Sequence, residues 1–282
     1  MRDKLFNILL WISGLSILAI TIGLGFSLVL QSIPAISQFG FFDFFTSSTW
    51  DPREDKESFG ALPFIAGSLL TALLALIIAT PFSLAVITLT NYITKKRFVK
   101  MIDRIIDAAS TIPPIVWGIW GYYTIRPTLD YLNIGDKGFG IICTSIVLAI
   151  MIIPFTVSYS SIYIRKIPNH FIEGAYALGA TRTEVTWKIK YPYVWKSLVS
   201  AHILGFSKAL GETMIAVILI GNSNMIPSGL SDTGNTMTSI LLTQSTTGST
   251  LKQSALFAIA LALFAITACI NLSVRRLIRK MP

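Results

Sequence analysis

Six runs of apolar residues constrain this chain more than any other feature, because they are long enough to form helices that cross a membrane. Such a helix needs about 20 predominantly apolar residues. The runs cover residues 5–30, 62–93, 108–125, 139–164, 194–220 and 254–274. Only 13% of the residues are charged, roughly half the share in a soluble domain. The sequence therefore predicts an all-α polytopic membrane protein with six transmembrane helices, and excludes an ordinary soluble enzyme.

The basic residues are divided unequally between the two sets of loops, and this sets the predicted orientation. Cytoplasmic loops carry an excess of lysine and arginine. Seventeen of the 23 basic residues fall in the terminal segments and in the loops after the second and fourth runs, and five fall in the opposite loops. We therefore expect a multi-pass protein of the inner cell membrane with both termini in the cytoplasm. An acidic cluster then faces outside: Asp51, Glu54, Asp55 and Glu57.

The chain is expected to have two parts. Residues 1–60 hold the first transmembrane helix and an extracytoplasmic loop, and residues 61–282 form a five-helix core. Residues 94–107 alternate basic and apolar side chains at helical spacing, which favours a helix on the inner membrane surface, in contact with anionic membrane lipid. Residues 239–242 are apolar but too short to span, so we expect a surface turn of helix or a dip into the headgroups.

The loop at about residues 168–192 is predicted to form a helical hairpin between the fourth and fifth apolar runs. Phe171, Ala175 and Leu178 share one helical face. Gly179 follows, and glycine readily takes the left-handed backbone conformation that ends a helix. We therefore expect the first helix of the hairpin to end at this glycine.

A second short helix is predicted to begin just after Gly179. Thr181 is a suitable N-cap, with Glu184 three residues later, as in a capping box. Glu184 and Lys188 are spaced for an ion pair, and Pro192 is expected to close the segment before the fifth run. A hairpin that projects from a helical bundle is suited to docking a cytoplasmic partner.

This loop resembles the signature loop of bacterial ABC importer permeases. The family pattern is Glu-Ala-Ala, three residues, Gly, nine residues, Ile, one residue, Leu-Pro; here Gly174 replaces the first alanine and Tyr191 replaces the leucine. The resemblance implies the type I ABC importer permease fold, with coupling helices that sit in a cleft of the ATP-hydrolysing subunit. The residues implied in ATPase coupling are Glu173, Gly174, Ala175, Gly179, Ile189 and Pro192.

Segments further along the chain are similar to the phosphate-specific importer permeases of the PstC type. These segments are Lys208-Ala209-Leu210-Gly211-Glu212-Thr213-Met214, Ile220-Gly221-Asn222, Trp50-Asp51-Pro52, Phe59-Gly60-Ala61-Leu62-Pro63, Ser110-Thr111-Ile112-Pro113 and Gly234-Asn235-Thr236. Lys208 stands where the family leads us to expect arginine, which keeps the charge but loses bidentate geometry. The resemblance implies a permease subunit that works with a second homologous permease, a cytoplasmic ABC ATPase dimer and an extracytoplasmic phosphate-binding protein. The alternatives are the sister phosphate permease and a permease for sulfate, molybdate or phosphonate.

Lys208 and Glu212 are the candidate residues of the translocation path. They are four residues apart and are expected to share a face of the fifth helix. A charge at bilayer depth is costly unless it is paired or faces water, so Lys208 either attracts the anion or forms an internal ion pair with Glu212 that fixes helix packing. Ser207 and Thr213 flank the pair; their hydroxyls can donate to a passing oxyanion or bond back to their own helix.

The sequence holds no phosphate loop of the G-x-x-x-x-G-K-[ST] type, so ATP hydrolysis is expected in a partner rather than here. His170 and His202 lack a second ligand at metal spacing, and we expect no metal, cofactor or nucleic acid. A secondary transporter usually shows paired halves with broken helices, which the sequence lacks. An intramembrane enzyme would need a catalytic set of residues at membrane depth, and none is evident.

Overall fold

The computed structural model of the chain describes residues 2–53, 57–92, 96–245 and 248–279. Glu54 and Asp55 of the predicted acidic cluster, and the basic residues Lys56, Lys95 and Lys280, lie outside these ranges. The structure is almost entirely helical. Its helices are α1 (Arg2–Phe39), α2 (Phe41–Thr46), α3 (Leu62–Tyr92), α4 (Lys96–Ser110), α5 (Pro114–Tyr131), α6 (Ile141–Ile164), α7 (Asn169–Ala177), α8 (Arg182–Glu184), the π-helical η1 (Val185–Lys190), α9 (Tyr191–Leu210), α10 (Met214–Leu219), α11 (Met237–Gln244) and α12 (Thr250–Arg279).

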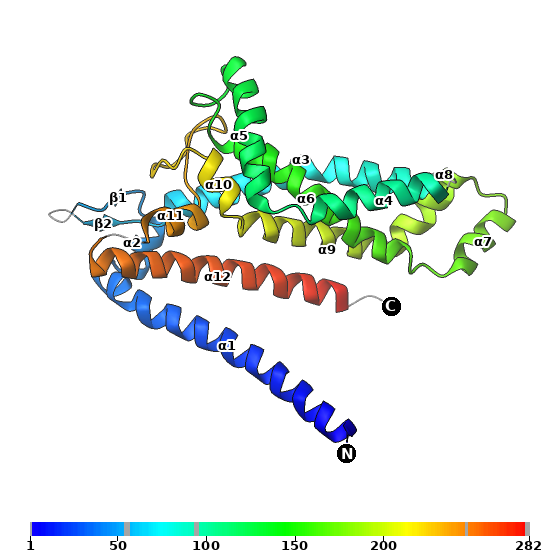
Figure 1. Cartoon of the computed structure of the whole chain (residues 1–282), viewed down its shortest axis with the longest axis horizontal. Coiled ribbons are helices and arrows are strands. Elements are labelled where there is room, and N and C mark those ends of the chain that lie inside the picture. The colour runs from blue at the N-terminus through cyan, green and yellow to red at the C-terminus, as the bar shows by residue number, and fades with distance from the viewer. Residues whose placement is uncertain (1, 54–56, 93–95, 246–247, 280–282) are drawn as a thin grey trace.

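Four helices of the described chain are long and apolar enough to cross a membrane. They are Phe6–Phe39, Leu62–Tyr92, Ile141–Ile164 and Thr250–Leu277, and they confirm four of the six predicted spans. Helices α5 and α9, of 18 and 20 residues, occupy parts of the other two runs but are not apolar enough to qualify as spans, so the count of six is not confirmed. Helices α3, α6, α9 and α12 lie side by side, whereas α1 diverges from them toward its N-terminus (Figure 1).

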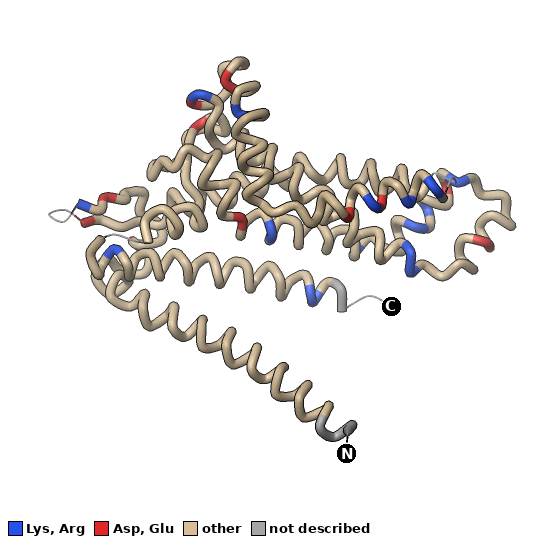
Figure 2. Tube along the Cα trace, viewed as in Figure 1, with Lys and Arg blue, Asp and Glu red and all other residues tan. Residues whose placement is uncertain are grey.

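Charged residues gather toward the two ends of this bundle, and the long helices between the ends carry few of them (Figure 2). One end carries α7, α8 and both chain termini, and we call it the hairpin end. The other end carries the strands β1 (Trp50–Asp51) and β2 (Ser58–Phe59), and we call it the loop end. This distribution is typical of a helical bundle whose middle lies in hydrocarbon.

The predicted third run is divided between two helices. α4 ends at Ser110 and α5 begins at Pro114, because a residue that precedes proline disfavours helical backbone. The Arg165 guanidinium pairs with Asp103 of α4 at 2.9 Å, and the Ser158 hydroxyl donates to Asp107 at 3.1 Å. These contacts place α4 antiparallel alongside α6. The prediction that residues 94–107 lie flat on the membrane surface is therefore wrong for α4, which runs along α6 while the apolar side chains of Phe98, Met101 and Ile105 stay exposed.

Small residues allow α9 to approach α6 closely. Ala201, Gly205 and Ala209 recur every four residues on α9 and are all buried. A Cβ atom at Gly205 would lie 2.7 Å from the Cγ2 methyl of Thr156 on α6. Such small residues at four-residue spacing let membrane helices pack with their backbones near one another. This contact fixes the position of the next residues on α9, including Lys208.

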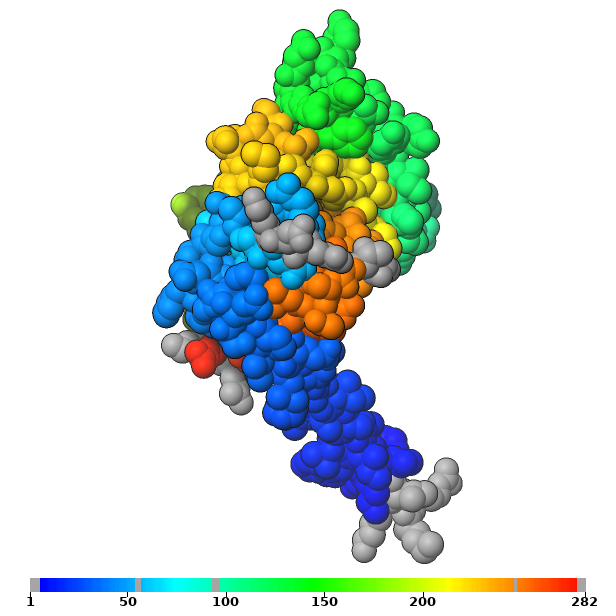
Figure 3. All heavy atoms as spheres, turned by 90° about the vertical axis from the view of Figure 1, so that its left-hand side faces the viewer, coloured from blue at the N-terminus to red at the C-terminus, as the bar shows by residue number. Residues whose placement is uncertain are grey.

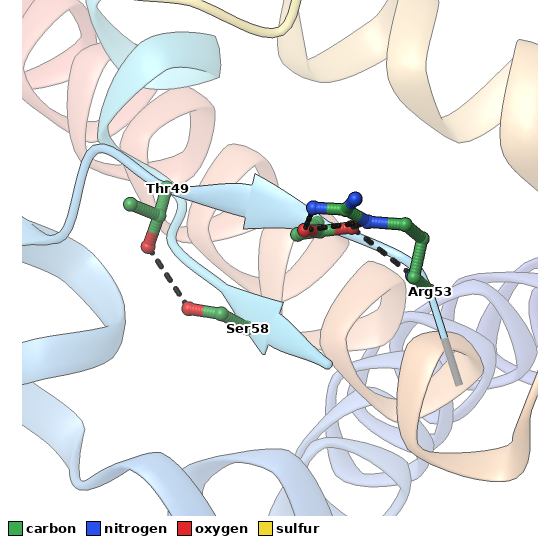
Figure 4. A network of polar contacts seen from close by, with 4 residues as sticks. Thr49, Arg53 and Ser58 are labelled. Atoms are coloured by element: carbon green, nitrogen blue, oxygen red, sulfur yellow. Dashed lines mark hydrogen bonds and ion pairs between the residues drawn. The ribbon is translucent and has the colours of Figure 1, made fainter. Parts of the chain in front are cut away.

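The two strands pair antiparallel at the loop end, with Trp50 opposite Phe59. The Trp50 ring lies 4.8 Å from Phe59 and 4.9 Å from Phe64 of α3, measured between ring centroids. Outside this aromatic core, the Thr49 and Ser58 hydroxyls lie 2.9 Å apart and Arg53 pairs with Asp51 (Figure 4). The strands thereby anchor the segment between α2 and α3 to the bundle.

Helix α11 lies at the loop end and packs against α3 and α12. Ser239 and Ile240 have no exposed surface, and the Met237 amide donates to the Ser68 hydroxyl of α3 at 2.8 Å. The expected surface position of residues 239–242 is therefore wrong for these two residues, because α11 is held inside by contacts with distant helices. Viewed from this end, the segment before α3 and the segments around α11 form one continuous face, and α1 projects away from it (Figure 3).

Candidate functional site

The predicted fifth span is broken in the middle of the candidate site. α9 ends at Leu210, three residues follow, and α10 begins at Met214. Gly211 is the C-cap, and its amide donates to the Ser207 carbonyl at 3.2 Å. The Glu212 carboxylate accepts a hydrogen bond from the Met214 amide at 3.0 Å, and thus interacts with the first turn of α10. Glu212 therefore stabilises the helix break rather than continuing the face of α9.

Lys208 does not form the ion pair with Glu212 that was one of the two alternatives from the sequence. Among the described residues, no carboxylate lies within 4.0 Å of its ammonium group. The Lys208 Nζ atom instead lies over the ring of Phe155 on α6, 4.8 Å from the ring centroid. The interpretation of a shared helical face is wrong because the helix ends between the two residues. They still attract each other electrostatically, at a longer distance.

Ser207 and Thr213 lie on either side of this break, and both are half-buried. Neither hydroxyl forms a hydrogen bond with any part of the chain that the structure describes. Both therefore remain available as donors near Lys208. Thr238 on α11, which the sequence did not single out, donates its hydroxyl to the Glu212 carbonyl at 2.9 Å and so ties the break to α11.

Two of the motifs that carry the phosphate resemblance meet beside this break. The Gly234 amide donates to the Ile220 carbonyl at 3.1 Å, and the Ser223 amide donates to the Gly234 carbonyl at 2.9 Å. Asn222 has a left-handed backbone, with φ of 53°, and its side-chain oxygen accepts from the Ser239 hydroxyl at 2.5 Å. These contacts hold the two irregular segments together, while Gly221 and Asn222 themselves are exposed.

The second feature is the hairpin at residues 168–192, whose first helix ends as predicted. Gly179 has φ of +83°. Its amide donates to the Tyr176 carbonyl, and the Ala180 amide donates to the Ala175 carbonyl, both at 3.0 Å. This pair of bonds is the Schellman motif. A Cβ atom at Gly179 would meet nothing within 4 Å, so the backbone conformation alone requires glycine here.

The second helix begins with the predicted capping box. The Thr181 hydroxyl accepts from the Glu184 amide at 3.3 Å, and the Glu184 carboxylate accepts from the Thr181 amide at 3.0 Å. Lys188 donates to the same carboxylate at 2.9 Å, which confirms the predicted ion pair. The Lys188 hydrogen bond, together with the Thr181 bonds, lowers the pKa of Glu184 to about 2. Burial lowers the pKa of the nearby Lys190 ammonium.

The residues implied in coupling lie on or beside exposed parts of this hairpin. Glu173 and Gly174 of α7 are exposed, Ala175 is half-buried, and Leu178 is 91% exposed. Ile189 is half-buried in η1. Pro192, expected to close the loop, instead lies in the first turn of α9, directly after the π-helical η1. The hairpin thus presents apolar and acidic side chains outward.

Both histidines have local explanations. The His202 ring nitrogens bond to the Ser83 hydroxyl at 2.7 Å and to the Leu198 carbonyl at 2.8 Å, which links α9 to α3. His170 lies against the Phe171 ring, with centroids 4.3 Å apart. Neither belongs to any group of three or more metal-ligating side chains in the described ranges.

A helical membrane bundle with an exposed helical hairpin between two of its long helices is the arrangement expected of an ABC importer permease. Residues 88–281 match the model of the binding-protein-dependent transport system inner membrane component family, and the chain belongs to this family. It is thus a multi-pass membrane transport component.

Within this family the chain is similar to phosphate permeases. It is 34% identical to the phosphate transport system permease protein PstC of Pasteurella multocida, over 89% of this chain and 83% of the relative. It is 33% identical to the phosphate transport system permease protein PstC of Haemophilus influenzae, over 90% of this chain and 86% of that relative. The fold is similar to a chain of a bacterial alginate ABC transporter, with a TM-score of 0.64, 15% identity, and coverage of 99% of this chain and 98% of that chain.

Proposed function

We propose that this chain is the membrane permease subunit of an ATP-driven importer of inorganic phosphate. The observation that carries the proposal is the similarity to a phosphate transport permease over 89% of the chain and 83% of that relative. Lys208 supports it, because a lysine on a membrane helix without an ion pair in the described chain provides the positive charge that an oxyanion needs.

The proposed translocation path passes the break between α9 and α10. Lys208 attracts the anion, and the free hydroxyls of Ser207 and Thr213 donate to its oxygens. Glu212 holds the break in shape through the first turn of α10, and its negative charge moderates the attraction of Lys208. A path must bind its substrate weakly enough to release it, and neutral donors beside a single charge suit this requirement.

We assign ATP hydrolysis to a partner, since the sequence has no phosphate loop. A cytoplasmic ATPase dimer is proposed to receive the hairpin through Glu173, Gly174, Ala175, Gly179, Ile189 and Pro192. A second, homologous permease would complete the path. An extracytoplasmic phosphate-binding protein would dock at the loop end, where the strands and α11 form a continuous face.

The proposed orientation places the hairpin end and both termini in the cytoplasm. The excess of basic residues in these segments supports it, as does the presence of both termini and the hairpin toward one end (Figure 1). We retain the proposed division into residues 1–60 and 61–282. The exposed N-terminal half of α1, residues 6–24, supports this division, whereas the C-terminal part of α1 packs against α12, where the Ala35 amide donates to the Ser254 hydroxyl at 2.9 Å.

The test is transport by the whole complex. The chain, its sister permease and its ATPase are purified together, reconstituted in liposomes, and supplied with the binding protein and radiolabelled phosphate. We expect ATP-dependent phosphate uptake that excess unlabelled phosphate abolishes and that sulfate, molybdate and phosphonate leave unchanged. Uptake of one of these competitors without uptake of phosphate would overturn the proposal in favour of another oxyanion.

A further inference from the structure

Three aromatic side chains form a ladder along α6. Phe155, Tyr159 and Tyr163 are spaced by four residues, so they share one side of the helix and extend over about 12 Å. The rings of Phe155 and Tyr159 stack with centroids 6.2 Å apart and 28° between planes. Those of Tyr159 and Tyr163 are 5.5 Å apart, and their hydroxyl oxygens lie 3.4 Å apart. We call these three residues the aromatic ladder.

A lysine lies at each end of the aromatic ladder. The Lys208 Nζ atom is 4.8 Å from the Phe155 centroid, and the Lys166 Nζ atom is 5.6 Å from the Tyr163 centroid. Within the described ranges neither ammonium group forms an ion pair. A cation–π contact positions a cation without neutralising its charge. The ladder therefore connects two positive charges that form no ion pair in the described chain, one at the helix break and one at the hairpin end.

The open side of the aromatic ladder is not covered by this chain. Its three side chains and Lys208 are all half-buried, and Lys166 is exposed. A charged group or a hydroxyl that faces hydrocarbon without a partner is costly. In a membrane, the exposed side of the ladder is therefore better matched to a water-filled path than to lipid.

We propose that the aromatic ladder forms the half of the phosphate path that leads from Lys208 to the hairpin end, with Tyr159 and Tyr163 as donors to the anion. The inference rests on the proposed function and adds residues to its path. Two neighbouring hydroxyls offer two hydrogen bonds to one tetrahedral oxyanion, and neither carries a charge that would retain it. Lys166 then attracts the anion toward the exit.

The first test removes the two hydroxyls and keeps both rings. The double variant Tyr159→Phe with Tyr163→Phe is compared with wild type in ATP-driven uptake of radiolabelled phosphate by the reconstituted complex. We expect the maximal rate to fall at least about fivefold, since each lost hydrogen bond is worth about 1 kcal/mol, with unchanged complex yield. The matched control is Tyr123→Phe with Tyr131→Phe on α5, whose side chains are 75% and 86% exposed and lie outside the ladder. Wild-type rates in the ladder variant would overturn the inference.

The second test does not depend on the identity of the substrate. In a complex whose Cys143 and Cys269 are replaced by alanine and serine, Tyr159→Cys is exposed to a charged, membrane-impermeant thiol reagent. We expect labelling, because a water-filled path admits the reagent. Ile17→Cys on α1, an apolar side chain that is 67% exposed, should remain unlabelled in lipid. If Tyr159→Cys is not labelled, with or without ATP, lipid or a partner helix covers the ladder and the inference is overturned. If it is labelled but the wild-type complex takes up no phosphate, the water-filled path stands and the assignment of phosphate as its substrate is overturned.

Discussion

The ammonium group of Lys208 lies over the ring of Phe155, 4.8 Å from its centroid, and so joins the end of α9 to the middle of α6. A contact of this kind contributes about 0.5–2 kcal/mol and leaves the charge available to an anion. The geometry separates two roles that a single ion pair would have combined: Lys208 supplies charge, and Glu212 supports the helix break.

Phosphate uptake by variants at Lys208 should depend on whether the side chain keeps its positive charge. Lys208→Arg keeps the charge and can also stack on Phe155, so we expect phosphate uptake to be retained. Lys208→Gln removes the charge, and we expect uptake to be lost while the complex still assembles. Uptake of radiolabelled phosphate by the reconstituted complex, measured together with complex yield, distinguishes the variants. Near-normal uptake by Lys208→Gln would show that the charge does not serve the substrate.

Glu212 should stabilise the protein more by accepting the hydrogen bond from the Met214 amide than by its electrostatic attraction to Lys208. Glu212→Gln keeps an oxygen that can accept from the Met214 amide, so we expect the complex to assemble normally. Glu212→Ala removes the acceptor and should cost about 0.5–2 kcal/mol, as the loss of a helix cap does. Thermal unfolding in detergent measures the difference. If both variants are equally destabilised, the negative charge itself is required.

Gly179 offers a test of the hairpin. Its φ is +83°, and a Cβ atom added there would have no neighbour within 4 Å, so Gly179→Val introduces backbone strain without a clash, at a cost of about 1–2 kcal/mol. We expect membrane insertion to persist and uptake to be lost, because the hairpin no longer keeps its turn. Gly14→Ala on α1 is the control outside the hairpin: Gly14 also has no neighbour within 4 Å, and alanine favours a helix. Normal uptake in Gly179→Val would argue against coupling through this turn.

The low pKa of Glu184 predicts a pH dependence of the second half of the hairpin. Because the folded pKa is lowered to about 2 from an ordinary 4.5, the stabilisation is complete above about pH 4.5 and is lost as the pH falls toward 2. The protection of the Glu184 and Val185 amides against hydrogen exchange, taken relative to the intrinsic exchange rate at each pH, should therefore decrease as the pH falls over this range. Glu184→Gln, which cannot ionise, should show no such transition. A carboxyl titration with a midpoint near 4.5 would contradict the prediction.

The features that the sequence predicted correctly depend on local chemistry. The turn at Gly179 and the capping box at Thr181 each involve residues within a few positions of one another, so their spacing is sufficient evidence. The helix break at Gly211 was missed because an apolar run reads as one helix, and the break depends on contacts of Glu212 and Thr238 that form only in the folded bundle. The course of α4 along α6 was missed for the same reason.

Gly205 tests whether close packing of α9 on α6 holds Lys208 in place. A Cβ atom there would lie 2.7 Å from the Thr156 Cγ2 methyl, and overpacking of this kind costs about 1–3 kcal/mol. We expect Gly205→Ala to lower both thermal stability and phosphate uptake. Thr156→Ser removes the methyl and keeps the hydroxyl that donates to the Ile153 carbonyl at 2.9 Å. The double variant should therefore recover much of both properties, as a double-mutant cycle would measure. Additive losses in the double variant would show that the two helices adjust independently of this contact.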